Sequence, residues 1–329
     1  MQGTGSDPQP TCLRRDPLDN GESPVLVIGG SGVDLIGRLK NELRPGTSNP
    51  ANIRTSFGGV ARNVAENLAR LGQPACLITA VGEDHTGDLL IRQAAAAGVD
   101  VSAVLRTPLH PTGAYLGVVG PTGNLYYALD DINATSALTP EYIQKHIGLF
   151  EKARLVFLDA NLPRDTLRTI FSQARRLRLP VCADPTSASL AERLRPYLPR
   201  LRMVTPNSAE AGVLCDQPFE DRNRNEALEA AKCLVSQGVE IALISLAAFG
   251  VVYATSTTSG HIPAVRTRIV DPTGAGDALT ATVIFGLLND IPLDDAVRLG
   301  VTAASLTLRE RGTVVQNLSL ELLYDNLIY

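Results

Sequence analysis

Short apolar runs alternate along this chain with longer segments whose apolar residues recur at helical spacing. The run 24–29 is typical of a strand buried on both faces. The segment Gly59–Leu71 places its apolar side chains on one helical face and Arg62, Glu66 and Arg70 opposite them. Further strands are predicted over 75–81, 155–158, 181–183, 203–205 and 241–246, and helices over 86–97 and 164–177. Because strands alternate with helices, we expect an α/β fold: a mostly parallel sheet, right-handed crossovers, and helices on both sides.

Two segments interrupt this alternation. Residues 35–57 contain no good helix and many turn residues. Residues 112–130 have the pattern of a hairpin, with strands over 114–119 and 125–129. Together they are expected to form a small antiparallel sheet that projects from the main domain. Such a sheet suits a lid, because closure over a site excludes water, and its exposed edge offers a surface for a homodimer.

Length and charge limit the class of protein. A chain of 329 residues fits one α/β domain with insertions, which we place at 24–329. Residues 1–23 are polar, rich in Pro and Gly, and predicted to be a disordered tail and not a signal peptide. The net charge of −4 argues against a nucleic-acid partner. Leucines interrupt the arginine-rich stretches 175–178 and 193–202, which are interpreted as solvated helix faces.

The cysteines indicate a reducing compartment. They are odd in number, widely spaced and include no Cys-x-x-Cys pair, so a cytoplasmic location is expected. Cys76 and Cys182 lie in apolar strand-like runs, which favours buried structural thiols. No run of about 18 apolar residues is present, so no membrane span is predicted.

The strongest chemical motif is Asp271-Pro-Thr-Gly-Ala-Gly-Asp277, which runs into the apolar segment Ala278–Leu288. Small residues at the start of a helix let backbone N–H groups approach an anion, and the helix N-terminus adds partial positive charge. Asp277 can accept a proton beside a phosphate held by this loop. The motif therefore predicts phosphoryl transfer.

Asp34 is a second candidate, near the end of the first predicted strand. The preceding Gly-Gly-Ser-Gly resembles a dinucleotide fingerprint, but Leu35 replaces the third glycine and no clear helix follows. We interpret Asp34 as a carboxylate that binds hydroxyl groups at the carboxyl end of the strand. The alternative is a turn aspartate that caps its own backbone.

Two further motifs each have two interpretations. Gly58 and Gly59 let backbone approach a ligand, and the amide of Asn63 could bind sugar hydroxyls; a plain helix start is the alternative. Asn207 and Glu210 lie three apart after a predicted strand, where a carboxylate can hold Mg²⁺ through its waters. Their alternative is a capping box.

Taken together, these motifs resemble the ribokinase (PfkB) family of carbohydrate and nucleoside kinases, over residues 24 to about 322. The resemblance implies a ribokinase-like three-layer α/β/α sandwich with a small β-sheet lid, and ATP and Mg²⁺ as cofactors. It makes Asp277 the base and Gly274, Ala275 and Gly276 the anion hole. The other positions that match the family are Asp34, Gly58, Gly59 and Asn63 for sugar, Asn207 and Glu210 for Mg²⁺ and phosphate, Asp271 and Thr273 for a monovalent cation such as K⁺, and Ser245 and Gly250 for the nucleotide.

Within the family, the chain is most similar to the pseudouridine kinases, which phosphorylate the 5′-hydroxyl of a free nucleoside. The resemblance rests on the segments 48–50, 58–68, 130–133 and 159–161. It implies a nucleoside substrate and a homodimer through the lid. Polar residues that could read the base or bind the nucleoside are Asn49, Thr112, Tyr115, Asn133 and Asn161.

The nucleotide turn departs from the family pattern. Ala247 and Ala248 stand where relatives usually carry glycine, and Val301 stands where some supply a polar neighbour for adenine. Methyl groups in this turn could crowd a triphosphate or change the turn. Three hypotheses follow: an ATP-dependent nucleoside kinase, which we favour, a sugar kinase of the same fold, and a non-catalytic ligand sensor. Because Asp277 and its glycines are intact, the sensor is disfavoured.

Overall fold

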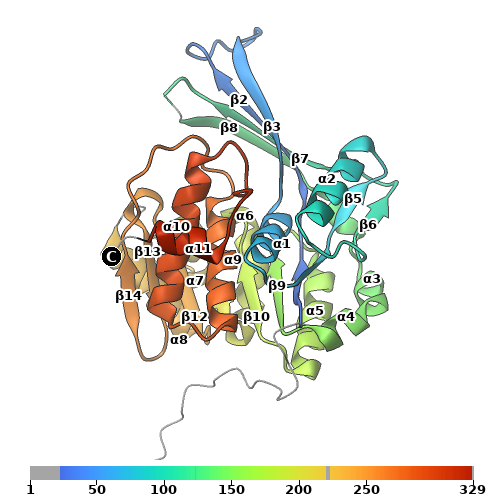
Figure 1. Ribbon diagram of the computed structural model, residues 1–329, viewed down its shortest axis with the longest axis vertical. Helices are drawn as coiled ribbons and strands as arrows, with labels where there is room; N and C mark the ends of the chain where they lie inside the picture. The colour runs from blue at the N-terminus through green and yellow to red at the C-terminus, as the bar shows by residue number, and fades with distance from the viewer. Residues whose placement is uncertain (1–22, 123, 220–222, 328–329) are drawn as a thin grey trace, which may run out of the picture.

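The structure is a computed structural model that describes residues 23–122, 124–219 and 223–327. The predicted tail and Cys12 therefore lie outside the described residues, apart from Ser23. Figure 1 shows a helix-covered body with a separate sheet projecting from one end. This arrangement confirms the predicted α/β class.

The main sheet has eight strands in the order β14-β13-β12-β11-β10-β9-β1-β4. All neighbours from β12 to β4 pair in parallel, while β13 and β14 extend the sheet as an antiparallel ribbon. The strands are β1 Val25–Ile28, β4 Ala75–Ile78, β9 Leu155–Asp159, β10 Val181–Asp184, β11 Met203–Val204, β12 Ile241–Ser245, β13 Val251–Ala254 and β14 Ser259–Ile262.

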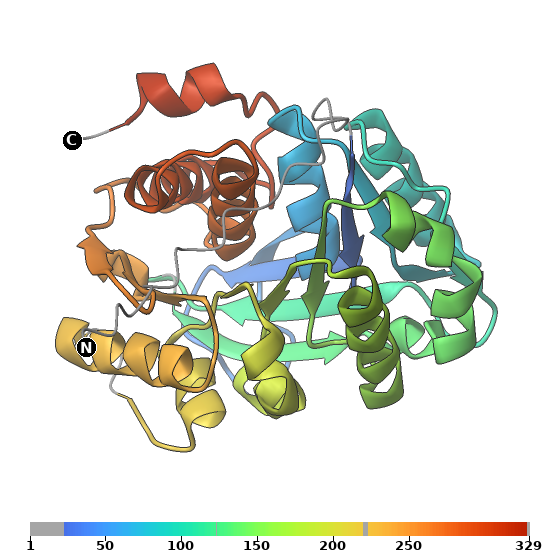
Figure 2. The same ribbon diagram turned by 90° about the horizontal axis from the view of Figure 1, so that it is seen from below.

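Helices cover both faces of this sheet (Figure 2). Alternate side chains of each strand point to opposite sides and so pack into two separate cores. In β1, Leu26 and Ile28 pack into one core, whereas Val25 and Val27 pack into the other. Residues of α1 Val60–Arg70, α2 His85–Ala96, α9 Ala275–Leu288, α10 Leu293–Arg309 and α11 Leu320–Asp325 line the second core. Those of α3 Pro140–Lys145, α4 Ile147–Lys152, α5 Arg164–Leu177, α6 Ala188–Ala191, α7 Ser208–Cys215 and α8 Arg224–Ser236 line the first. The 3₁₀ turns are η1 Asn133–Ala137, η2 Glu192–Arg200 and η3 Ala247–Phe249.

The projecting sheet has the order β3-β2-β7-β8, from β2 Gly32–Leu39, β3 Ala51–Gly58, β7 Gly113–Val119 and β8 Leu125–Asp131. The expected antiparallel pairing holds for β2 with β3 and for β7 with β8. The central pair β2 and β7 is parallel, so the sheet is mixed. The two hairpins come from distant parts of the chain, and sequence pattern did not indicate how they join.

The strand predicted over 75–81 divides into two. β4 ends at Ile78, and β5 Ala80–Gly82 pairs with β6 Leu105–Thr107 in a separate sheet. Between them, the buried Thr79 hydroxyl lies 2.7 Å from Gly29 O and 2.8 Å from Ser31 Oγ. A continuous apolar run does not reveal such a change of sheet.

The cysteines and the arginines of α5 lie as the sequence predicts. Cys76 and Cys182 are buried and the described cysteines are unpaired. Arg175, Arg176 and Arg178 lie along and just beyond the last turn of α5, and Arg175 and Arg176 are exposed, as predicted for a solvated helix face. No described helix combines the length and apolar character needed to cross a membrane.

Candidate active site

Carboxylates from distant parts of the chain meet where the parallel strands end. β9 ends on Asp159 and β10 ends on Asp184. Charge interactions connect Asp277 with both of them and with Asp34. The carboxyl edge of an open α/β sheet is where such folds bind ligands, so this acidic group marks the candidate site.

The loop 271–277 forms an uncapped helix start. Gly274 has φ +82° and precedes α9, but it has no side chain to cap the first turn. The first helical bond of normal length is from Ala278 N–H to Gly274 O, at 2.9 Å, while Ala275 N–H makes a 3.5 Å contact with Pro272 O. Donors left without helical acceptors, at the positive end of the helix dipole, suit an anion.

Glycines in this loop differ in what surrounds them. A β-carbon on Gly274 would collide with the carbonyl group of Thr313, so the fold requires glycine there. A β-carbon on Gly276 would have no atom within 4 Å. The open space beside Gly276, next to free donors, fits the phosphates of a nucleotide.

Asp277 is held by Asn63. Asn63 Nδ2 donates to Asp277 Oδ2 at 2.7 Å, which joins α1 to the start of α9. Burial raises the pKa of Asp277 to about 6, with a further increase from Asp159 and decreases from the Asn63 hydrogen bond and the Arg62 charge. A carboxylate with a pKa near neutrality is suited to accept a proton from a hydroxyl group.

Asp34 faces the same region from β2. Its side chain is buried, and burial, followed by the charges of Asp277 and Asp271, raises its pKa to about 7. Gly58 gives Asp34 its space, since a β-carbon there would collide with the carboxylate. Gly59, with φ +95°, packs against the backbone of Ser31 in the same way. These glycines are therefore required by close packing as well as available for ligand approach.

Asp159 belongs to the segment 159–161 that carries part of the family resemblance, but no role was predicted for it. It is fully buried, and its carboxylate accepts from the amides of Gly30 at 2.8 Å, Ala61 at 3.1 Å and Asn161 at 3.0 Å. Burial raises the pKa of Asp159. It ties β1, α1 and β9 together near Asp277, and it brings the predicted Asn161 to the edge of the site. Its position at the end of an apolar run was the available signal.

Asn207 and Glu210 form a capping box at the start of α7, which was the alternative interpretation of this motif. Asn207 Oδ1 accepts from Glu210 N–H at 2.9 Å, and Glu210 Oε2 accepts from Asn207 N–H at 2.9 Å. Burial raises the pKa of Glu210. Asp184, also missed from the sequence, lies close enough that burial and then the Glu210 charge raise its pKa well above the usual value. An acidic pair of this kind fits Mg²⁺, which would relieve the repulsion.

Within the described residues, no three His, Cys, Asp or Glu side chains are grouped so as to hold a metal by themselves. Asp271 is buried, and its Oδ1 accepts from Thr273 N–H at 2.9 Å. Any metal here would thus take part of its coordination from water or phosphate.

The nucleotide turn lies at the end of β12, where Ser245 is the last residue. Gly250 has φ +94° and contacts the backbone of Ile262, so glycine is required. Ala247 adopts φ +47°, in the left-handed region that favours glycine. Ala247 and Ala248 are both exposed, so the turn accommodates their methyl groups without burying them.

Two of the predicted lid residues, Asn49 and Thr112, bond away from this cluster. The Asn49 amide folds back on its own loop, accepting from Arg44 N–H and donating to Arg44 O and Thr47 O. The Thr112 hydroxyl donates to Asp84 at 2.7 Å, beside the start of α2. Asn133 follows β8 at the start of η1. Tyr115 pairs with Asp34 across β2 and β7 and so lies beside it.

Comparison with known proteins agrees with this fold. The family model described as pfkB family carbohydrate kinase matches residues 23–319. The chain is 32% identical to a pseudouridine kinase of Escherichia coli K12, over 86% of this chain and 90% of that protein. It is 27% identical to a guanosine-inosine kinase of Exiguobacterium acetylicum, over 85% and 93%. A ribokinase of Arabidopsis thaliana, solved with ribose and ATP, superposes with a TM-score of 0.81 at 21% identity, over 93% and 99%.

Proposed function

Because this chain belongs to the pfkB family of carbohydrate kinases, a family of sugar and nucleoside kinases, we propose that it transfers the γ-phosphoryl group of ATP to the 5′-hydroxyl of pseudouridine. The observation that carries the reaction is the Asn63–Asp277 pair beside an uncapped helix start. The similarity to a pseudouridine kinase supports the choice of nucleoside.

Asp277 is the base in this proposal. It takes the proton of the 5′-hydroxyl as the oxygen forms a bond to the γ-phosphorus, and the bond to ADP breaks with its electron pair leaving on ADP. The backbone N–H groups of Gly274, Ala275 and Gly276 stabilise the negative charge that develops on the transferring phosphoryl group. Asn63 holds the carboxylate in place from the other side.

The donor side is proposed along the ends of β11 and β12. Asn207, Ser245 and Gly250 would hold the nucleotide, with Thr273 beside its phosphates. When bound, Mg²⁺ supplies charge neutralisation to the phosphates. Asp184 and Glu210 would hold it through waters, which is supported by the raised pKa values of these two neighbouring carboxyl groups. We also assign Asp271 and Thr273 to K⁺, to be tested by comparing turnover in KCl and NaCl.

The nucleoside is proposed to lie between the main body and the projecting sheet. Asp34, Gly58, Gly59 and Asn63 would hold the ribose. Tyr115 pairs with Asp34 across β2 and β7, and the Asn161 N–H bonds to Asp159, so both would contact the base. Asn49, Thr112 and Asn133 would contribute after closure of the sheet as a lid. Closure would exclude water from the phosphoryl group.

A homodimer through the lid is supported by an apolar face. Asp34, Ser56 and Tyr115 are neighbours on one face of the projecting sheet. The opposite face exposes large apolar side chains, namely Ile53, Leu116, Tyr127 and Leu129. A contiguous apolar face of this kind marks an interaction surface. Sedimentation of the protein as a monomer at micromolar concentration would refute the dimer.

The discriminating experiment is ADP release with pseudouridine, uridine and ribose, each at several concentrations. The proposal predicts the highest kcat/KM with pseudouridine. The second candidate is a sugar kinase, favoured by the likeness to the ribokinase solved with ribose; turnover of ribose alone would establish it. The unpaired cysteines are consistent with the proposed cytoplasmic location.

A further inference from the structure

Arg62 is buried although it is charged. The sequence places Arg62, Glu66 and Arg70 opposite the apolar face of α1, where solvent would be expected. In the structure Arg62 is 1% exposed and Glu66 is 0% exposed. Charged residues are almost never buried so completely unless they are paired, so this part of α1 has a specific role.

The contacts of Arg62 lead to the candidate base. Its Nη1 lies 2.9 Å from Asn63 Oδ1, 3.1 Å from Phe57 O and 3.2 Å from Thr313 Oγ1. Its Nη2 forms an ion pair with Glu66. Thr313 Oγ1 also lies 3.0 Å from Asn63 Oδ1. The guanidinium group therefore joins a buried carboxylate to the amide that holds Asp277.

These contacts determine the orientation of the Asn63 amide. An asparagine amide has an accepting oxygen and a donating nitrogen at its two ends, and it can be turned by 180°. Arg62 can only donate, so it selects the orientation in which Oδ1 faces it and Nδ2 faces Asp277. In the opposite orientation, two acceptors would face each other at Asp277 and two donors at Arg62.

We propose that Arg62 is a positioning residue for this kinase: its guanidinium fixes the orientation of the Asn63 amide, and through it the place and charge of the base Asp277. This inference rests on the proposed function. The side chain of Arg62 bonds to Glu66, Asn63, Phe57 and Thr313 and reaches Asp277 only through Asn63.

A second arginine, Arg70, also pairs with Glu66, so Arg62 is not needed only to balance the charge of Glu66. Glu66 Oε1 accepts from Arg70 Nε at 2.9 Å and from Arg70 Nη2 at 2.6 Å. The buried carboxylate thus keeps a cationic partner without Arg62. Arg70 contacts Glu66 and Gln316 but not Asn63, and so provides a matched control on the same helix.

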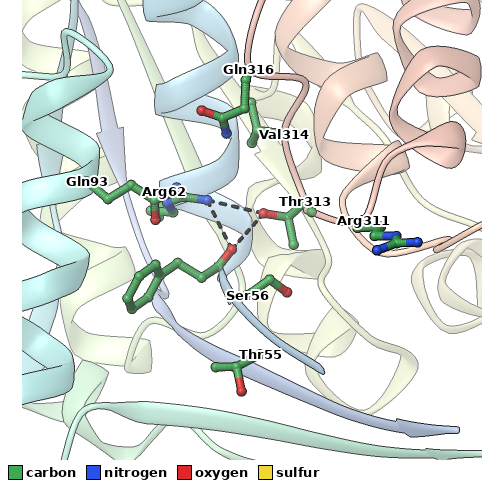
Figure 3. A pocket seen from close by; sticks show the side chains of 10 residues that line it. Thr55, Ser56, Arg62, Gln93, Arg311, Thr313, Val314 and Gln316 are labelled. Carbon is green, nitrogen blue, oxygen red and sulfur yellow. Dashed lines mark hydrogen bonds between the residues drawn. The ribbon is translucent and has the colours of Figure 1, made fainter. Parts of the chain in front are cut away.

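A cavity beside Arg62 allows chemical rescue. It has a volume of about 320 Å³, and Arg62, Gln93 and Thr313 are among its lining residues (Figure 3). The Nε atom of Arg62 and the Oε1 atom of Gln93 are buried there without hydrogen-bond partners among the described residues. The space that Arg62→Ala would leave would adjoin this cavity, which gives a free guanidinium ion room to bind.

The groups that face Asp277 come from several elements. Asn63 and Arg62 lie on α1, and the neighbouring carboxylates are Asp34 on β2, Asp159 on β9 and Asp184 on β10. Loss of the Asn63 donation and of the Arg62 charge leaves these carboxylates unopposed. The pKa of Asp277 is thus expected to rise in Arg62→Ala.

The test compares Arg62→Ala with Arg70→Ala. In Arg62→Ala we expect kcat to fall by about 10–100-fold, with the acid limb of kcat/KM moved up by about one pH unit and KM for ATP unchanged. Millimolar guanidinium should restore kcat and the native acid limb, and the effect should saturate as its concentration rises, whereas methylammonium should have no effect. In Arg70→Ala the pH limb should match the native enzyme. A native pH limb in Arg62→Ala, or an equal shift in Arg70→Ala, would overturn the proposal.

Two further measurements keep the test decisive. If Arg62→Ala does not fold, Arg62→Lys preserves a charge beside Glu66, but a single ammonium group replaces the planar fork that bonds Glu66 and Asn63 together. Because the charge is kept, a smaller shift in the same direction is expected, and a native profile would overturn the inference. The Asp277 carboxyl pKa, measured by NMR with ¹³C-labelled aspartate, needs no substrate. An enzyme without kinase activity whose Asp277 pKa still rises in the variant would refute the proposed function and not the positioning by Arg62.

Discussion

The carbonyl group of Thr313 occupies the space into which a side chain on Gly274 would point. Two glycines of one loop therefore carry different constraints. Gly274→Ala should destabilise the protein by about 2 kcal/mol or more, because a φ of +82° is unfavourable for alanine and the methyl group collides with backbone. Thermal unfolding with and without ATP measures this effect.

Gly276→Ala is the matched substitution at the neighbouring site. Its methyl group would meet no protein atom, so the melting temperature should stay within about 2 °C of the native value. The methyl group would, however, stand in the proposed anion hole, and kcat should fall by about 10²-fold. Native turnover in this variant would place the phosphate elsewhere.

Asp277→Asn removes the proposed base while preserving its shape. Turnover should fall by about 10²–10⁴-fold, with nucleoside and ATP still bound, since general base catalysis contributes on that scale. Rapid-quench measurement of phosphoryl transfer and calorimetric titration of the ligands separate the two effects. An unchanged rate would remove Asp277 from the mechanism.

The pH dependence follows from the raised pKa of Asp277. Because the base must be ionised and burial raises its pKa to about 6, kcat/KM should increase as the pH rises through 6 and level off above it. Below that value it should fall about tenfold per pH unit. A limb near pH 4 would mean that the active base is a solvated carboxylate.

Asp34→Asn should stabilise the fold in the alkaline range. The folded-state pKa of about 7 exceeds the ordinary value of 3.8, so the native state favours the protonated form and loses stability as the pH rises from 3.8 to 7. Asparagine lacks this penalty, and the free energy of unfolding should increase by about 2 kcal/mol at pH 8. The gain should shrink as the pH falls toward 4. Denaturant unfolding at both pH values checks the sign.

Ala247→Gly tests the turn where this chain departs from its relatives. Glycine relieves the left-handed φ of +47°, so the variant should be more stable by about 0.5–1 kcal/mol. Ala248→Gly serves as the control, because Ala248 is not among the residues with positive φ. A lower KM for ATP in Ala247→Gly alone would show that the native methyl group crowds the nucleotide.

Much of the fold could be predicted because its strands and helices are strongly patterned. The strands at 155–158, 181–183 and 241–246 lie within a residue or two of β9, β10 and β12. What could not be predicted was how distant segments pair. The parallel contact of β2 with β7 and the departure of β5 from the main sheet depend on tertiary packing and have no local signal.

The candidate site was predictable where reactive side chains and an anion-binding backbone lie in one short segment of sequence. Gly274 and Asp277 belong to a loop in which small residues, a helix start and a carboxylate follow one another, a combination that favours phosphate chemistry. Asp159, Asp184 and Arg62 were not predicted as site residues, because a single polar residue at the end of an apolar run, or on the charged face of a helix, has many ordinary roles. Their importance comes from burial and from contacts made between distant parts of the chain, such as that of Asp159 with the Ala61 amide.

The joining of β2 to β7 has a consequence for how the protein acquires its shape. Between these two strands the chain runs through β3, α1, β4, β5, α2 and β6. Long-range pairing of this kind is slow to form, because the chain loses the entropy of closing the intervening loop before the strand contacts contribute any stability. The projecting sheet is therefore expected to form after the central body during folding, and its amides to gain protection from hydrogen exchange last. A nascent chain would possess its phosphate loop only once residue 277 is made, long after both hairpins of that sheet have been synthesised.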